Sequence, residues 1–583
     1  RGPPTPDTEI AAVDTTTLGS AYSPVDYMSI TSFPRLPEDD VMSGENTLKS
    51  RKDEDNVLSE QDTDPDLFLK SARLQRLPSS ASDLASHDDA SLQETTIDPF
   101  TEECACQRDG LTVIITACLT FATGVTVALI MQIYFGDPQV FKQGAVVTDA
   151  AQCTSLGFNV LGKQGSSVDA AITAALCLGI VHPHTSGIGG GGVMLVHDIR
   201  KNETRIIDFR ETAPYAIHEE MMQRNLENPG LLVGVPGVLS GLHQAHQLYG
   251  RYGNYSVCPR TVNNYGLCVG FWVQAKGGVL TEEDFGNYST VLQKPAEVTY
   301  QGHHVMAAPA PHAGVALITA LNILEGYNIT SQVPRNSTYH WIAESMKIAL
   351  ALASGLGDPM YDTSVSEIVT KMQSKSQASL LRQMISDSQA FPVSHYTSSF
   401  TLEEGAAAAQ VMVMGPDDHI VSVMSSLNKP FGSGIVTPSG ILLNSQILDF
   451  TWPNKTQSSS PNPHNRLQPG KRPMSFLMPT AVRPAVGLCG TYVAVGSSNG
   501  QKALSSITQV LINVLSSRKN MSDSLAYGRL HPQLQPNTLL VDCEFRIDVL
   551  SLVEGTRRTN DLIIGVKDPR SADASALTMS TVP

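Results

Sequence analysis

Residues 401–450 decide the fold and read TLEEGAAAAQVMVMGPDDHIVSVMSSLNKPFGSGIVTPSGILLNSQILDF. Two short apolar runs, 411–414 and 420–424, flank Gly-Pro-Asp-Asp, which is a turn signal. This pattern predicts a buried β-hairpin. A Gly-rich turn at 431–434 follows, and the polar side chains around it suit a small polar ligand. An ordinary hairpin with a satisfied polar loop is the simpler alternative. The polar side chains are Ser425, Ser426, Asn428, Gln446 and Asp449.

Composition predicts a loop-rich α/β globule with an acidic extension. The 583 residues are 41% hydrophobic and include 45 Gly and 35 Pro. The net charge of −16 is concentrated in residues 1–109, which hold 23 acidic and 9 basic residues, against 33 and 31 in the remainder. No basic patch is left to neutralise phosphates, so nucleic acid is not an expected partner.

The acidic extension, residues 1–108, is predicted to be a disordered cytosolic tail, because it holds too little apolar surface to offset its chain entropy. A transmembrane helix is predicted at 109–136. Residues 111–135 contain no charge, and at a rise of about 1.5 Å per residue they cross a hydrocarbon core of about 30 Å. A signal peptide is disfavoured because over a hundred residues precede the span. A buried core helix is the remaining alternative.

Glycosylation sequons predict the orientation. Seven Asn-X-Ser/Thr sequons follow the span and none precedes it. Because sequons are used only on the lumenal side, we expect a single-pass type II membrane protein with an extracellular or lumenal ectodomain. The acceptor residues are Asn202, Asn254, Asn287, Asn328, Asn336, Asn454 and Asn520.

The cysteines suggest neither a metal site nor a disulfide scaffold. Six of nine follow the span, widely spaced, and no CxxC or HExxH motif occurs. Cys177 lies in an apolar helix-like run, which predicts a buried thiol. A bond between Cys258 and Cys268 is an alternative. We expect no metal and no other cofactor.

The start of the ectodomain predicts a strand at 145–148 and a helix at 167–180 capped by Ser166 or Ser167. A Gly run at 187–192 then leads into a strand, which lets backbone approach backbone or ligand closely. Further along, Arg210 comes directly after a predicted strand. Its planar fork suits a carboxylate.

An ordered set of segments resembles the gamma-glutamyltransferase (glutathione hydrolase) family over roughly residues 144–570. The matching segments are VVTDAAQC, VDAAITAALCLGIVHPHTSGIGGGG, DFRETAP, VGVPGVLSGLHQAH, AAPAPHAGVALITALNILEGYN, the hairpin region, QPGKRPMSF and VAVGSSNG. The resemblance implies an N-terminal-nucleophile hydrolase fold, a four-layer αββα sandwich. It also implies a large-subunit-like region at 137–405 and a small-subunit-like region at 406–583.

In active members of that family the chain cuts itself into two subunits, which form a heterodimer. The new N-terminal Thr, with its own amine as base, attacks the γ-glutamyl amide of glutathione. The glutamyl group passes to water or to an amino-acid acceptor. The resemblance therefore implies glutathione or another γ-glutamyl compound as the small-molecule ligand of a membrane-bound protein.

The resemblance also assigns positions. It implies carboxylate binding by Arg210, and α-amino binding at the family's acidic pair, Gln446 and Asp449. The remaining substrate positions are Ser426, Asn428, Ser475 and Phe476, and the oxyanion-hole positions are Asn499 and Gly500. The nucleophile falls on Ala407, within one position along the alanine run.

Four of these positions depart from the family pattern. No Thr, Ser or Cys lies between Glu403 and Gln410, and alanine has no atom that can attack an amide. Gln446, Phe476 and Asn499 are further departures. We therefore expect an impaired or inactive enzyme and a single uncleaved chain. The alternative is a non-catalytic protein that binds γ-glutamyl compounds or a protein partner. Activity would then need a nucleophile from elsewhere, and Ser425 and Ser433 are the candidates.

Two regions are shorter than the family pattern, at 250–286 and just after residue 545. Either the protein has diverged from its relatives, or the sequence reflects splicing or an incomplete gene model. Loss of packed helices is expected to expose core surface.

Overall fold

The computed structural model describes residues 110–135, 144–225, 227–251, 259–330, 332–396, 402, 407–453, 455, 461–542, 552–559 and 562–579. The predicted tail lies outside these ranges. So do Asn254, Asn454 and Cys258.

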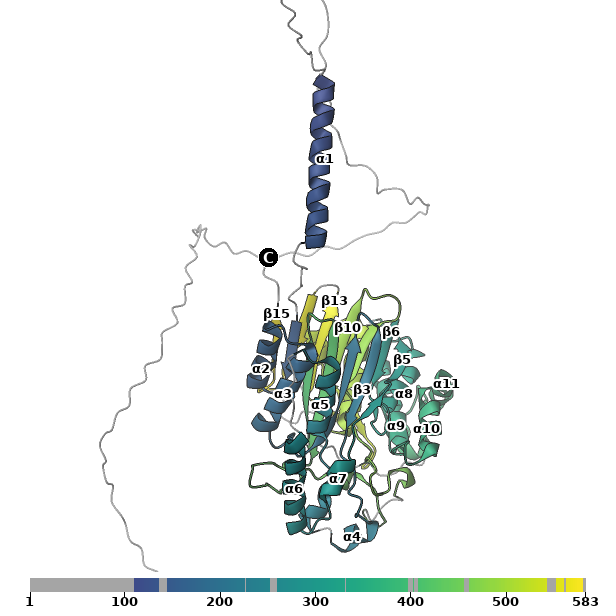
Figure 1. Cartoon of the computed structure of the whole chain (residues 1–583). Helices are drawn as coiled ribbons and strands as arrows, with labels where there is room; N and C mark the ends of the chain where they lie inside the picture. The colour runs from purple at the N-terminus through teal and green to yellow at the C-terminus, as the bar shows by residue number, and fades with distance from the viewer. Residues whose placement is uncertain are drawn as a thin grey trace, which may run out of the picture. The chain divides into compact units, whose positions relative to one another are not determined.

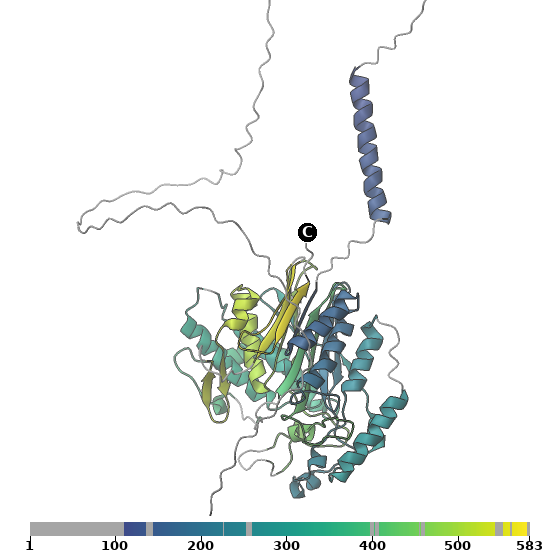
Figure 2. The ribbon, with the colours of Figure 1, turned by 90° about the vertical axis from the view of Figure 1, so that its left-hand side faces the viewer.

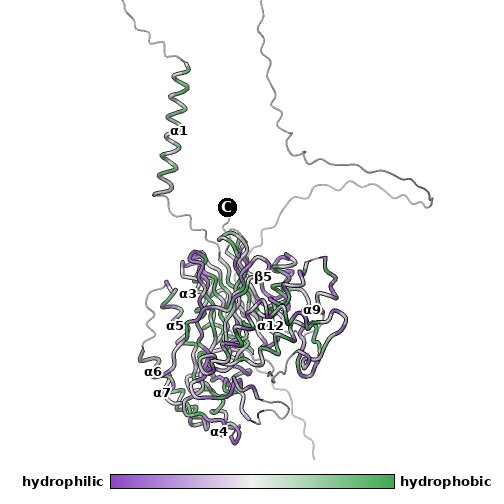
Figure 3. The backbone as a smooth tube through the Cα atoms, turned by 90° about the vertical axis from the view of Figure 1, so that its right-hand side faces the viewer, coloured by the Kyte–Doolittle hydropathy of each residue, from purple (hydrophilic) through white to green (hydrophobic). Residues whose placement is uncertain are grey.

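The predicted span forms a helix, α1 (Gly110–Phe135), whose residues 110–131 have a mean hydropathy of 2.3 and are not buried by protein. Figure 3 shows its largely hydrophobic course. Four threonine hydroxyls along it donate to carbonyls one turn back, for example Thr116 Oγ1 to Thr112 O at 2.8 Å. These four hydroxyls are thus satisfied within the helix, as a hydrocarbon environment requires. By length and composition α1 can cross a membrane.

The predicted hairpin lies at the centre of a seven-stranded antiparallel sheet ordered β15-β1-β7-β8-β2-β3-β4. Its strands β7 (Ala407–Met414) and β8 (His419–Asn428) are joined by the Gly-Pro-Asp-Asp turn, with Met414 opposite Ile420. The other strands are β1 (Gly144–Thr148), β2 (Gly191–Asp198), β3 (Glu203–Phe209), β4 (Val291–Gln293) and β15 (Ser575–Met579).

A six-stranded antiparallel sheet, ordered β14-β13-β10-β9-β6-β5, packs against the first. Apolar side chains from both sheets, such as Met412 and Ala494, form the core between them. The strands are β5 (Ala296–Tyr300), β6 (His303–Ala307), β9 (Thr480–Pro484), β10 (Thr491–Ser497), β13 (Val553–Thr559) and β14 (Leu562–Val566).

Helices cover the outer face of each sheet (Figures 1 and 2). A second core lies under α2 (Ala151–Gly162), α3 (Ser167–Val181) and α5 (Val238–Tyr249) on the seven-stranded sheet. A third lies under α8 (Gly314–Glu325), α9 (Arg335–Ala353) and α12 (Gln501–Leu511) on the other. The four-layer αββα sandwich implied by the resemblance is confirmed.

The remaining helices and one small hairpin lie around this sandwich. The shortened region forms α6 (Pro259–Ala275) and α7 (Glu282–Asn287), and Val269 and Val273 of α6 are fully buried. On the same helix Phe271 is 67% exposed, so part of its apolar surface is uncovered. The others are α4 (Glu219–Arg224), α10 (Thr363–Gln373), α11 (Lys375–Gln383), α13 (Met521–Ala526) and the hairpin β11 (Leu530–Gln533) and β12 (Thr538–Val541).

Helix α3 begins as its sequence predicts. Ser166 and Asp169 form a reciprocal capping box, each side chain accepting a 3.0 Å hydrogen bond from the other's backbone N–H. The prediction that Cys177 is a buried thiol is wrong, because Cys177 forms a disulfide with Cys153. Helices α2 and α3 pack side by side, which brings the two Cα atoms within 5.4 Å. Cys268 has a free thiol, against the Cys258–Cys268 alternative.

Candidate functional site

The site begins with Arg210, which directly follows β3 and is only 2% exposed. Its Nη2 donates to Asp449 Oδ2 at 2.5 Å and to Met474 O at 3.2 Å, and its Nε donates to Pro473 O at 3.4 Å. These bonds hold the guanidinium in one orientation and satisfy part of its donor set.

Three predicted residues converge on the same carboxylate. Asp449 ends a 3-10 turn, Gln446–Asp449. Asn428 Nδ2 donates to Asp449 Oδ1 at 3.0 Å, and Gln446 Nε2 donates to Asp449 Oδ2 at 3.1 Å. Together with the Arg210 bond, this makes a cluster of four side chains, Arg210, Asn428, Gln446 and Asp449, which we call the glutamyl cradle.

The backbone conformation at Asn428 and the close packing behind the 446–449 turn position the cradle side chains. Asn428 ends β8 with φ +74°, a left-handed conformation that Asn tolerates better than most residues. Behind the turn, Asn444 Nδ2 donates to Gly189 O at 2.8 Å and to Gly234 O at 2.9 Å. A Cβ on Gly190 would overlap the Ser426 carbonyl. The Gly run therefore permits the close backbone approach expected from the sequence.

Ala407 lies beside the cradle, at the start of β7 and opposite Asn428. Ser426 Oγ donates to Ala407 O at 2.6 Å. Ala407 is partly exposed, whereas Ala408 and Ala409, beyond a register shift, are 5% and 2% exposed. The predicted nucleophile position is Ala407 or the alanine on either side of it, and each of these residues carries only a methyl group.

Neither substitute nucleophile is placed for chemistry. Side chains alternate along a strand, so Ser425 points to the opposite face from Ser426 and contacts Ser186 Oγ at 2.5 Å. Ser433 Oγ donates to Leu443 O at 3.0 Å. Among the described residues, neither hydroxyl bonds to a histidine, lysine or carboxylate that could act as a base.

Of the other predicted positions, Ser475 lies beside the cradle, because it follows Met474, whose carbonyl accepts from Arg210. Ser475 Oγ accepts from Leu477 N at 3.0 Å, and Phe476 packs against the core under α8. Asn499 (φ +80°) and Gly500 (φ +56°) form the turn between β10 and α12. The end of β10 lies against the start of β7, because a Cβ on Gly496 would be 3.0 Å from Gln410 Oε1.

Sequence reasoning missed Glu211, a fully buried acid adjacent to Arg210. Its Oε2 lies 3.8 Å from Arg210 Nη1, yet burial outweighs that attraction and raises the pKa of Glu211 to about 8. Glu211 is therefore mainly protonated at neutral pH. The DFRETAP segment contains this residue, but no sequence pattern distinguishes a buried carboxyl from an exposed one.

A second buried acidic group was also missed. Asp149 Oδ2 accepts from Gln410 N at 2.7 Å, and burial raises the pKa of Asp149 to about 7. Glu554 is opposite Gly496 in the sheet, is fully buried, and has its pKa raised by burial and by Asp149. In the part of the chain that the structure describes, no three His, Cys, Asp or Glu side chains converge as metal ligands would.

The predicted glycosylation sites that the structure describes all lie at the exposed surface. They are Asn202, Asn287, Asn328, Asn336 and Asn520.

Comparison with known proteins places this geometry in context. The Gamma-glutamyltranspeptidase family model matches residues 153–256 and 272–577. Human Glutathione hydrolase 7 is 54% identical over 649 aligned positions, covering 96% of this chain and 98% of the human protein. Glutathione hydrolase proenzyme 2 of Schizosaccharomyces pombe is 28% identical, over 75% of this chain and 87% of that protein. A solved cephalosporin acylase from Bacillus halodurans superposes with a TM-score of 0.61 at 19% identity, over 75% and 96% of the two chains, which shows a shared fold.

The alignment to the human protein is longer than this chain, 649 positions against 583 residues. The human protein therefore contains segments that this chain lacks. The family match is also interrupted at 257–271, inside the shortened region.

Proposed function

Because the chain belongs to the gamma-glutamyltranspeptidase family, we propose that it binds the γ-glutamyl group of glutathione or a related compound but is impaired or inactive in the family reaction. The family reaction is cleavage of the γ-glutamyl amide and transfer of the glutamyl group to water or to amino-acid acceptors. The observation that carries the proposal is the glutamyl cradle beside three alanines, Ala407, Ala408 and Ala409.

The cradle is complementary to an α-amino acid head group. Arg210 offers a fork for the carboxylate, and Asp449 offers a negative charge for the ammonium. In the ligand-free protein the two side chains satisfy each other at 2.5 Å. A ligand that carries both charges would replace this single contact with two. Gln446 has a neutral amide where the resemblance implies a second acid. The ligand's ammonium group therefore loses one charge-assisted contact, which is worth about 1.5–3 kcal/mol.

Acyl transfer needs an atom that attacks the amide carbon and a group that takes its proton. Ala407 has neither a hydroxyl nor a thiol. Ser426 Oγ, the hydroxyl that contacts its backbone, donates to that carbonyl and accepts from Asn428 N at 2.8 Å. The hydroxyl is held by backbone groups and has no base beside it among the described residues.

Full glutathione hydrolase activity is the second candidate. It is favoured by the 54% identity with a protein named Glutathione hydrolase 7 over 98% of that protein's length. It requires a nucleophile other than residues 407–409.

We further propose a type II membrane topology, with the ectodomain on the extracellular or lumenal side. Three features support it: the apolar helix α1, the exposed sequon asparagines, and the Cys153–Cys177 disulfide, which is typical of oxidising compartments. The large-subunit-like and small-subunit-like regions, 137–405 and 406–583, contribute interleaved strands to both sheets. We expect them to remain one uncleaved chain.

One experiment tests cleavage and topology together. The full chain is expressed in cell membranes, treated with an N-glycosidase, and run on a denaturing gel. We expect one intact band that gains mobility after treatment. Two fragments separated near residue 407 would overturn the uncleaved-chain proposal. Unchanged mobility would contradict a lumenal ectodomain.

Activity is then measured as release of a chromogenic γ-glutamyl amide, comparing the natural chain with Ala406→Thr, Ala407→Thr and Ala408→Thr. We expect no release above background from the natural chain, because the nucleophile is missing. Retention of labelled glutathione on the natural chain, lost in Arg210→Gln, is the expected sign of binding. Catalytic release by the natural chain would instead establish the hydrolase candidate.

A further inference from the structure

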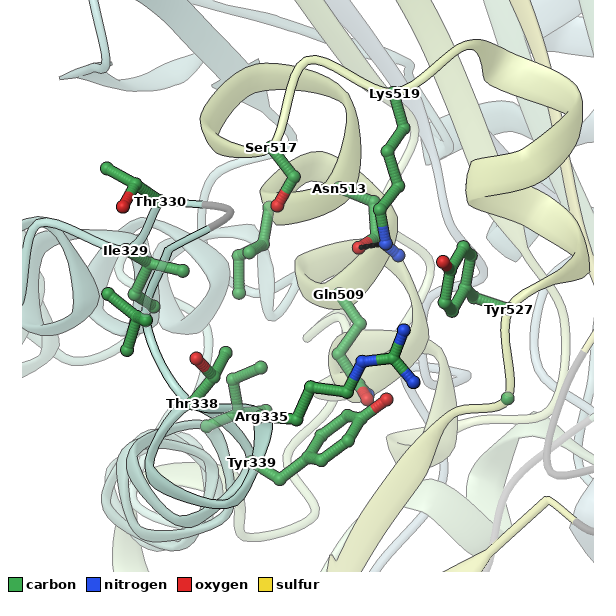
Figure 4. A pocket seen from close by; sticks show the side chains of 14 residues that line it. Ile329, Thr330, Arg335, Thr338, Tyr339, Gln509, Asn513, Ser517, Lys519 and Tyr527 are labelled. Carbon is green, nitrogen blue, oxygen red and sulfur yellow. Dashed lines mark hydrogen bonds between the residues drawn. The ribbon is translucent and has the colours of Figure 1, made fainter. Parts of the chain in front are cut away.

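A cavity of about 220 Å³ lies away from the glutamyl cradle, among α9, the end of α12, and the segment that leads from α13 to β11 (Figure 4). The loop that precedes α9 contributes Ile329 and Thr330, and α9 itself contributes Arg335, Thr338 and Tyr339. None of the residues assigned above to the γ-glutamyl ligand lines it. At about 220 Å³ it is smaller than the roughly 300–1,000 Å³ of pockets for drug-sized ligands, so its occupant is small.

The charged lining of the cavity is entirely cationic. Figure 4 shows the Arg335 guanidinium and the Lys519 ammonium directed to the same side, next to the Tyr527 ring. Lys519 Nζ donates to Asn513 Oδ1 at 3.2 Å and lies 3.3 Å from the centre of the Tyr527 ring. No Asp or Glu lines the cavity, and among the described residues no carboxylate forms an ion pair with Arg335 or Lys519. Two positive charges therefore face this space without a protein anion.

Part of the lining is apolar. Ile329 lies across the cavity from the two cations (Figure 4), and Ile342 and Ile512 also line the cavity. The three side chains are 3%, 3% and 2% exposed and belong to the core under α8 and α9. Hydroxyls of Thr330, Thr338 and Ser517 border this side (Figure 4). The cavity thus has a cationic end and an apolar end.

A π-helical turn, Ile512–Ser516, shapes one wall. Gln509, Asn513 and Ser517 are spaced by four residues, and the wider π turn after α12 keeps all three on the cavity side. Gln509 cannot serve as a free amide, because its Nε2 donates to Ser505 O and Leu530 O, each at 2.8 Å. Asn513, Ser517 and the two cations are left to contact a ligand.

From these features we propose that the cavity binds a small carboxylate with a short branched or linear apolar chain. The carboxylate lies between Arg335 and Lys519, where both contacts are charge-assisted. The chain lies against the three isoleucines. An inorganic anion would satisfy the cations but make no apolar contact with the isoleucines, and a neutral compound would leave the two cations unpaired.

The test titrates the full chain in detergent with isovalerate, isovaleramide or inorganic phosphate, by calorimetry. We expect isovalerate to bind at least about tenfold more tightly than the isosteric amide, because the amide loses the charge-assisted contacts. Arg335→Gln and Lys519→Gln are each expected to weaken isovalerate binding by about tenfold or more, and Arg335→Lys by less. Equal binding of acid and amide, no isovalerate binding, or tighter binding of phosphate would overturn the proposal.

Arg518→Gln is the matched control. Arg518 is an exposed cation next to Lys519 in sequence but does not line the cavity, so isovalerate affinity should be unchanged. Equal thermal stability of all variants excludes misfolding as the cause of lost binding. Thr330 and Thr338 belong to the sequons of Asn328 and Asn336, so the titration is repeated after N-glycosidase treatment. Binding that appears only after treatment would identify the chain's own glycan as the occupant and overturn the proposal.

Discussion

At the scale of single residues, the chain has the four side chains that we propose to hold a glutamyl head group, and the alanines beside them carry no nucleophilic atom. Disruption of the cradle is nevertheless expected to destabilise the fold. Arg210 is a buried cation, and the side chain of its charged partner, Asp449, is only 20% exposed. Such pairs add little net stability as a whole, but removal of one partner leaves an uncompensated charge.

Asp449→Asn is therefore expected to lower the free energy of unfolding by about 3 kcal/mol, because Arg210 then keeps only the Glu211 carboxyl, 3.8 Å away and with a raised pKa, as an acidic neighbour. The measurement is urea unfolding at pH 7. The exposed pair Arg205–Glu203 provides the control, and Glu203→Gln should cost less than about 1 kcal/mol. Equal costs for the two variants would show that the cradle pair is not effectively buried.

At the scale of elements, the disulfide and the capping box secure the first helical layer. Helix α3 is apolar on nearly all sides because it lies between the seven-stranded sheet and helices α2 and α5. Its ends are held separately, by Ser166 and Asp169 at the start and by the bond from Cys177 to Cys153 near the end.

Cys153→Ser combined with Cys177→Ser is expected to lower the free energy of unfolding by about 3 kcal/mol, since the bond closes a loop of 24 residues. The same loss should follow reduction of the natural chain, measured by urea unfolding with and without a thiol reductant. Cys489→Ser, which replaces an exposed free thiol, should change stability by less than about 0.5 kcal/mol. Insensitivity of the natural chain to the reductant would rule out a stabilising bond.

At the scale of the whole molecule, the regions before and after residue 406 are interdependent. In the seven-stranded sheet β7 and β8 insert between β1 and β2, and in the other sheet β9 pairs with β6. The acids Asp149, which is partly buried, and Glu554, which is fully buried, come from opposite sides of that division, and their proximity and burial make ionisation costly.

This pair predicts a pH dependence of stability. Burial raises the folded pKa of Asp149 from 3.8 to about 7 and that of Glu554 well above 4.5, so the folded state binds protons that the unfolded state releases. The contribution is fully present below the unfolded pKa values and is lost as the pH rises through about 7, with a slope of up to ~1.4 kcal/mol per pH unit for each carboxyl. Glu554→Gln should therefore flatten the fall in unfolding free energy between pH 5 and 8.

Urea unfolding at four pH values gives the slope, and the exposed Glu220→Gln should leave it unchanged. Other groups titrate in this window, among them Glu211, whose pKa is raised to about 8 by burial, and His419, whose pKa is raised by Asp417 despite burial. The difference in pH slope between Glu554→Gln and the natural chain isolates the contribution of Asp149 and Glu554. Parallel pH profiles for Glu554→Gln and the natural chain would contradict the prediction.

The sequence by itself determined the apolar span, the hairpin, the capped helix α3 and, through the order of its motifs, the family and the αββα fold. The span, the hairpin and the capped helix follow from local periodicity and turn chemistry, which neighbouring residues encode. The family and the fold follow only from the resemblance of the motifs to a known family. The sequence also determined that residues 407–409 carry no nucleophile, because all three are alanines and their side chains have no oxygen or sulfur atom.

Only the tertiary structure decided which distant groups meet. The contact between Arg210 and Asp449 joins residues 239 positions apart, and sheet register puts Ser426 beside Ala407 but Ser425 on the other face. The Cys153–Cys177 bond, the raised pKa of Glu211 and the cationic cavity were likewise invisible in the sequence. The physical reason is that pairing, burial and charge environment depend on which elements pack together, and local sequence patterns do not specify those partners.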